Sequence, residues 1–190
     1  MRKPERTSLR NRKAIRNAIA DRRGSTAVEF AIVAPAFLTL MFSTFEAGWF
    51  YFANSQLDAA VIEASRFVRT GQAQKQGLDK QGFFNAVCPK LDVFGDCGER
   101  LTVEVETFSS FAELAADTSA TVCSTDSAEQ IDAIPYDPGL DNQIVRVRLC
   151  LVYRTINPTI GLNLSDASNG TRKLYGSYLF RNEPFSRNQR

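Results

Sequence analysis

The side chains that most enzymes need are missing from this sequence of 190 residues. It contains no histidine, which excludes Ser-His-Asp and Cys-His catalysis and every histidine-ligated metal site. It also has no glycine-rich phosphate-binding loop, and no two of its four cysteines have C-x2-C spacing, so we expect no cofactor and no metal. The sequence therefore predicts a protein without enzymatic activity. Its remaining chemistry lies in the cysteines and in one segment near the N-terminus.

That segment consists of Gly24, four residues, and then Glu29 and Phe30. It follows a basic arm: residues 1–23 hold nine basic and two acidic side chains, a charge of +7, while the rest of the chain carries −5. Glycine lets a backbone become extended and enter a tight site. A carboxylate at the edge of an apolar run is costly unless it has a use. Together these features indicate a functional segment rather than ordinary surface.

The apolar run contains 16 consecutive uncharged residues, 30–45, between Glu29 and Glu46. With its flanks, over about residues 27–50, it is long enough for a helix to cross a hydrocarbon core of ~30 Å. Trp49 then belongs to the aromatic residues at the distal interface, and the basic arm stays in the cytoplasm by the positive-inside rule. We expect a single-pass protein of the bacterial inner membrane, with its N-terminus cytoplasmic and its body in the periplasm.

Three other interpretations fit less well. A buried core helix does not explain the basic flank on one side only. A secretory signal peptide would be shorter and would end in small residues, whereas this run leads into the aromatic residues 49–52. A basic arm can also bind nucleic acid, but the adjacent apolar run favours a membrane surface, so we expect no nucleic-acid partner.

The segment around Gly24 resembles the processing site of type IV prepilins, and most closely that of the TadE-like family of the Flp/Tad pilus system. The resemblance continues along residues 30–35, 46–48 and 57–66, about a quarter of the chain. It implies that a membrane-embedded aspartyl prepilin peptidase cuts after Gly24 on the cytoplasmic face, so that Ser25 becomes the N-terminus. Glu29 then becomes the fifth residue, followed by Phe30, and it can pair with the new amine of its own or a neighbouring chain.

The same resemblance implies a minor pilin or pilus-assembly component that supports fibre assembly and surface adhesion. Its partners would be the prepilin peptidase, other Tad pilus subunits and the inner-membrane assembly platform. The large body resembles minor pseudopilins more than the small major pilins. The alternative is an uncleaved single-pass membrane-anchored periplasmic binding or adhesion protein, in which the prepilin-like site is never cut.

We expect three divisions: a basic cytoplasmic leader (1–24), a transmembrane and amphipathic helix (25–70), and a periplasmic α+β domain (71–190). The last part of the long helix places four apolar side chains on one face, at Leu57, Val61, Ala64 and Val68. This face suits either the packing of a filament or contact with the protein's own body.

The body is expected to hold one further helix, over residues 79–94, which Pro89 interrupts. Alternating apolar and polar residues predict three strands, over residues 101–106, 144–154 and 174–181. The polar stretch 109–139 reads as an irregular connection. The predicted fold class is α+β, with a small antiparallel sheet packed on helices. Arg146, Arg148 and Arg154 share one face of the second strand, which we expect to be solvated rather than to bind a partner.

All four cysteines lie on the side expected to be periplasmic, where disulfides form. Four cysteines allow three pairings. Cys88 and Cys97 are separated by a helix end and by Gly95, so a local bridge between them is feasible. By elimination, Cys123 pairs with Cys150, which would tie the polar connection to the sheet.

Overall fold

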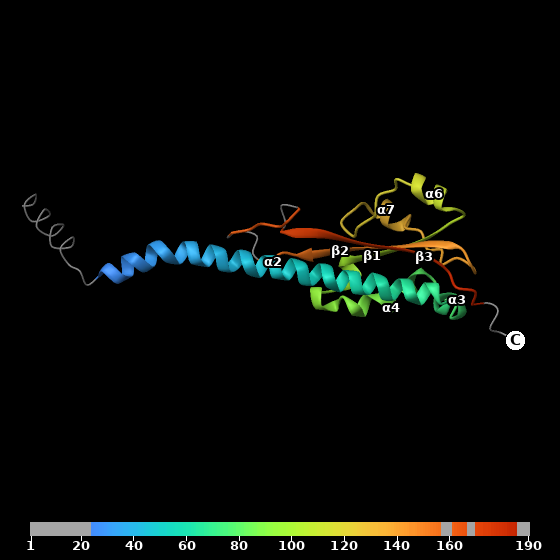
Figure 1. Cartoon of the computed structure of the whole chain (residues 1–190), viewed down its shortest axis with the longest axis horizontal. Coiled ribbons are helices and arrows are strands. Elements are labelled where there is room, and N and C mark those ends of the chain that lie inside the picture. Colours follow the sequence, from blue (N-terminus) through green and yellow to red (C-terminus); the bar gives the residue numbers. More distant parts are fainter. Residues whose placement is uncertain (1–23, 157–160, 167–169, 186–190) are drawn as a thin grey trace, which may run out of the picture.

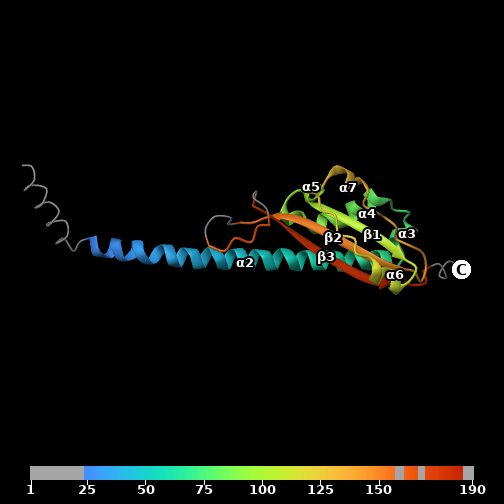
Figure 2. The ribbon, with the colours of Figure 1, turned by 90° about the horizontal axis from the view of Figure 1, so that it is seen from above.

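The structure is a computed structural model that describes residues 24–156, 161–166 and 170–185; the basic leader, apart from Gly24, lies outside the described residues. A single long helix, α2 (Ser25–Arg69), forms the rod in Figures 1 and 2, and the body is attached to its C-terminal part. At about 1.5 Å per residue its 45 residues extend for ~68 Å. Pro35 lies within it. The helix ends where expected, because Gly71 takes a left-handed φ of 75° directly after the C-cap residue Thr70.

Short helical elements follow: α3 (Gln72–Lys75), α4 (Lys80–Val87), the 3-10 turns η2 (Cys88–Lys90) and η3 (Asp92–Phe94), and α5 (Cys97–Arg100). The helix predicted over residues 79–94 is therefore correct only in its first half. The α-helix ends at Val87, two residues before Pro89, which has no amide hydrogen with which to continue the helical hydrogen bonds.

Three antiparallel strands form one sheet in the order β1-β2-β3: β1 (Leu101–Phe108), β2 (Ile144–Arg154) and β3 (Thr171–Arg181). The predicted α+β class, with a small antiparallel sheet packed on helices, is confirmed. The connection between β1 and β2 is less irregular than predicted, because it contains α6 (Phe111–Ala116) and α7 (Ala128–Asp132). Both are too short to show helical periodicity, and serine side chains cap their N-termini.

One face of the sheet packs on the C-terminal half of α2 (Figure 2). The apolar face predicted on this helix is almost fully buried there, at Leu57, Val61, Ala64 and Val68. Leu57 and Val61 lie directly against Gly176 of β3. Of the two uses left open for this face, the structure shows contact with the protein's own body.

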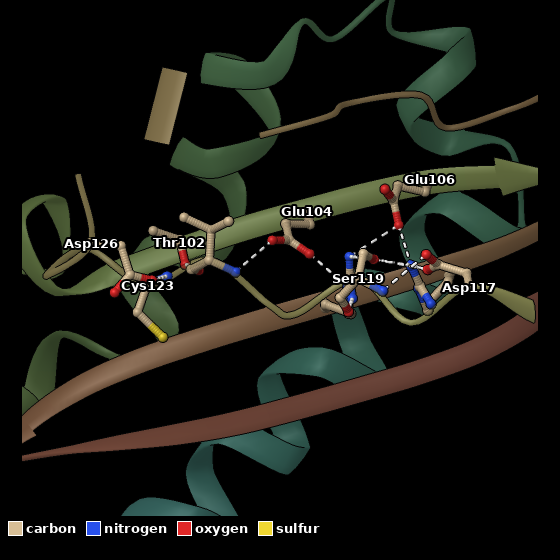
Figure 3. Close-up of polar contacts among 10 residues, drawn as sticks. Thr102, Glu104, Glu106, Asp117, Ser119, Cys123 and Asp126 are labelled. Atoms are coloured by element: carbon tan, nitrogen blue, oxygen red, sulfur yellow. Dashed lines mark hydrogen bonds and ion pairs between the residues drawn. The ribbon is translucent and has the colours of Figure 1, made fainter. Parts of the chain in front are cut away.

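The opposite face of the sheet carries charged side chains under the connection between β1 and β2 (Figure 3). Arg148 Nε lies 2.6 Å from Glu104 Oε2, and the side chains of both residues are less than a tenth exposed. Arg146 contacts Glu106 and Asp117. The expectation that this arginine face is solvated was therefore wrong for Arg146 and Arg148, because acidic residues of β1 and of the connection cover them, whereas Arg154 at the end of β2 is exposed. β1 is likewise buried on both faces over its first five residues.

Two disulfides hold the body together. The structure joins Cys88 to Cys97 and Cys123 to Cys150, with Cα–Cα distances of 5.7 and 5.3 Å. These are the pairs named from the sequence. The first bridge links η2 to α5, and the second ties the long connection to β2. Asp92 lies near the first pair, but both sulfurs are already bonded to each other and so offer no thiolate to a metal.

Candidate processing and membrane site

Gly24 is the N-cap residue of α2 and is exposed, with φ −96° and ψ 0°. A Cβ atom added at this position would meet nothing within 4 Å. Neither the packing nor the backbone conformation of the described chain requires glycine here. The glycine is therefore compatible with recognition by another protein, whose narrow cleft would accept a backbone that carries no side chain.

Glu29 lies one helical turn after Ser25 on the same face of α2. The Ser25 hydroxyl donates a hydrogen bond to Glu29 Oε1 at 3.0 Å, so the two residues are already close in the uncut chain. Cleavage after Gly24 would turn the amide nitrogen of Ser25 into an ammonium group, one turn from the carboxylate. Phe30 points outward and is exposed. The geometry thus allows the pairing expected from the sequence, within one chain or between neighbours.

The first half of α2 has an unusually apolar surface. Its exposed large side chains are Val28, Phe30, Ile32, Val33, Phe37, Leu38, Leu40 and Phe45. None of the residues in its most apolar 18-residue stretch is buried in the rest of the protein. Among the described residues, α2 is the one helix that is long and apolar enough to span a membrane. So large an apolar surface marks a region that lipid or other protein covers.

Comparison with known proteins gives one match: residues 24–66 match the model of the TadE-like protein family. The TadE-like segment therefore covers 43 of the 190 residues. The resemblance noted in the sequence is confirmed, and the match begins at Gly24 and ends three residues before α2 does. TadE-like proteins are pilus components and not known enzymes, which indicates a Tad pilus-related protein. No curated protein and no solved structure matches the chain.

A second carboxylate of the TadE-like segment, Glu46, follows the apolar run and is fully buried. The Ile156 amide, just after β2, donates to Glu46 Oε2 at 2.9 Å. The sequence alone places Glu46 at the outer end of the apolar run and gives no sign of its contact with the Ile156 amide. The two residues are 110 positions apart, and no motif links them.

Strongly shifted pKa values among the described residues outside the TadE-like segment come from structural contacts. The hydrogen bond from Arg146 lowers the pKa of Asp117 to about 2, and burial raises the pKa of Tyr136 and that of Tyr153 to about 12. Each shift favours the charge state that the group already has at neutral pH. These groups therefore serve as ion-pair partners or neutral phenols, not as an activated base or nucleophile.

Proposed function

We propose that this protein is a TadE-like minor pilin or pilus-assembly component that a prepilin peptidase cuts after Gly24. One observation carries the proposal: the family match begins at Gly24, the N-cap residue of the exposed, membrane-length helix, and a carboxylate lies one turn inside that helix. The uncut chain would be held by its basic leader at the anionic cytoplasmic surface. After cleavage the apolar helix would remain as the anchor, with the body in the periplasm.

In this account Glu29 acts after cleavage. A carboxylate that enters a low-dielectric bundle needs a cation, and the new N-terminal ammonium of Ser25 supplies one. Pairing with a neighbouring chain would favour one register of the helices as a fibre assembles. The partners are the prepilin peptidase, other Tad pilus subunits and the inner-membrane assembly platform, and the assembled product supports surface adhesion.

A second candidate is a permanently anchored periplasmic protein that binds or adheres without being cut. One observation favours it: the Ser25–Glu29 hydrogen bond satisfies the carboxylate without any new amine. The N-terminal residue of the membrane-bound chain distinguishes the two candidates, since the first requires Ser25 and the second retains the leader.

Membrane topology is the first testable consequence. A reporter that is active only in the periplasm, fused after Arg190, should be active, because the basic arm stays inside by the positive-inside rule. A reporter that is active only in the cytoplasm, fused at the same place, should be silent. The opposite pair of results would contradict the proposed orientation.

Glu29→Gln tests the role of the carboxylate after cleavage. The amide keeps the size and polarity of the side chain but cannot neutralise an ammonium group, so we expect normal cleavage and fewer pili per cell. Pili are counted by electron microscopy, and cleavage is followed by gel mobility. Glu63→Gln is the matched control, because this glutamate lies on the same helix beyond the apolar stretch and pairs with Lys90. Equal pilus numbers in both variants and the wild type would remove Glu29 from assembly.

A further inference from the structure

Of the loop between β2 and β3, the structure describes residues 155–156, 161–166 and 170. These residues lie beside α2, at the end of the sheet nearest the N-terminal half of this helix (Figures 1 and 2). They meet α2 at two polar positions: the Ile156 amide donates to Glu46, and the Leu162 amide donates to Ser43 Oγ at 3.0 Å. The loop thus satisfies polar side chains that lie inside or at the edge of the apolar segment of α2.

The approach of the loop to α2 is very close at Gly161. This residue has φ +84°, and a Cβ there would lie 2.4 Å from Ser43 Oγ and 2.9 Å from the carbonyl oxygen of Thr39. Only glycine fits this position without moving one of the two segments. The sequence of the loop is therefore compatible with this close contact, which places Gly161 beside residues 39–43 of α2.

The depth of this contact follows from the helix geometry. Glu29 and Glu46 are 17 residues apart, which is about 26 Å along an α-helix and close to the ~30 Å thickness of a hydrocarbon core. If the two carboxylates mark the two edges of that core, Ser43 and Thr39 lie roughly 5 and 10 Å inside the outer edge. Gly161, which lies against both residues, then also lies inside the leaflet.

The exposed side chains of the loop residues Ile156 and Leu162 are apolar and are compatible with contact to lipid acyl chains. Ile156 and Leu162 are 56% and 43% exposed, while their backbone amides are satisfied by α2. Non-helical backbone at membrane depth is tolerated when protein satisfies its polar groups. Beside Ile156, an apolar groove of about 550 Å³ is lined by Phe42, Phe45, Trp49 and Phe52. It opens from the exposed apolar surface of α2.

Basic and aromatic side chains lie just beyond this groove, where lipid headgroups would be. The Arg172 guanidinium lies 4.7 Å from the centre of the Phe50 ring and donates to the Leu164 carbonyl at 2.7 Å. Arg154, at the end of β2, is exposed. Arginine and aromatic side chains at this level are typical of the interface between hydrocarbon and water.

We propose that residues 161–162 of the β2–β3 loop enter the outer leaflet beside α2 and that acyl chains of the membrane fill the groove beside Trp49. The body would then rest on the bilayer surface, with the loop replacing lipid around Ser43 and Glu46. This proposal rests on the proposed function only in requiring α2 to span the membrane. Continuity of the groove with the apolar surface of α2 favours lipid over a second protein chain as its occupant.

Tryptophan fluorescence can test this, because Trp49 is the only tryptophan in the chain. Three variants carry Trp49→Phe together with one new tryptophan: Leu162→Trp in the loop, Phe37→Trp in the middle of the apolar stretch, and Phe111→Trp on α6. Each full-length chain is placed in phosphatidylcholine–phosphatidylglycerol nanodiscs at one chain per disc. Emission is measured with brominated acyl chains and, separately, with iodide in the water. Phe111 is 59% exposed and belongs to α6, which lies far from the described residues of the loop in Figure 2, so it serves as the aqueous control.

We expect brominated lipid to remove most of the emission of the Leu162→Trp and Phe37→Trp variants, and iodide to quench only the Phe111→Trp variant. A loop tryptophan that iodide quenches and brominated lipid does not would overturn the proposal. A loop tryptophan protected from both quenchers would show that protein, not lipid, covers the loop, and would also overturn the proposal. Failure of brominated lipid to quench the Phe37→Trp variant would instead contradict the membrane-spanning helix on which the proposed function depends.

Discussion

Gly24→Leu is expected to leave the leader attached to nearly all of the chain. Leucine has a branched side chain that does not fit a cleft shaped for glycine at the scissile bond. The helix itself should be unaffected, because a Cβ at this position meets no neighbour. Retention of residues 1–24 is read from the mass of the membrane-bound chain.

Two further variants serve as comparisons for Gly24→Leu. Gly24→Ala adds only a methyl group and should be cut partly. Ala31→Leu adds similar bulk seven residues away, at an exposed position of the same helix, and should be cut normally. Full cleavage of the Gly24→Leu chain would show that no glycine-specific recognition occurs at this site.

The second large effect is expected in the body, for Arg148→Met. The change leaves Glu104 buried without its cation, and breaking one side of a buried ion pair costs about 3–5 kcal/mol. For a chain of this length each kcal/mol lowers the midpoint of thermal unfolding by about 2–4 °C. We therefore expect a fall of roughly 10 °C, measured by circular dichroism on the full chain in detergent.

The matched control is Arg69→Met, which removes an ion pair with Glu183 whose side chains are 40% and 55% exposed. Exposed pairs contribute about 0–1 kcal/mol, so this midpoint should fall by no more than ~4 °C. Adding Glu104→Leu to Arg148→Met should recover much of the loss, because no unpaired charge then remains in the interior. Equal losses for the two single arginine variants would contradict the structural role of the buried pair.

The parts of the fold that local pattern determines could be predicted from the sequence. The long helix follows from an apolar run without a strong break, and β2 from alternation over residues 144–154, which matches its bounds. β3 begins three residues earlier than predicted, since Thr171 to Lys173 are polar yet pair with the end of β2. The Gly24–Glu29 segment could be identified because its spacing lies within one stretch of chain.

The parts that depend on contacts between distant segments could not be predicted. Arg146 and Arg148 alternate as a solvated face would, and only the folded connection brings Asp117 and Ser119 over them. Glu46 likewise looks like an interface residue until the chain 110 positions later returns to donate its amide. In both cases a charge is buried by a loop whose position no periodicity encodes.

The most direct test of the account is the intact mass of the wild-type chain, extracted from membranes of cells with an active prepilin peptidase and read together with its N-terminal sequence. The account predicts a chain that begins at Ser25 and lacks residues 1–24, and it predicts the full-length mass when the peptidase is absent. A chain that begins at Met1 in cells with active peptidase would contradict the account and support the permanently anchored protein instead.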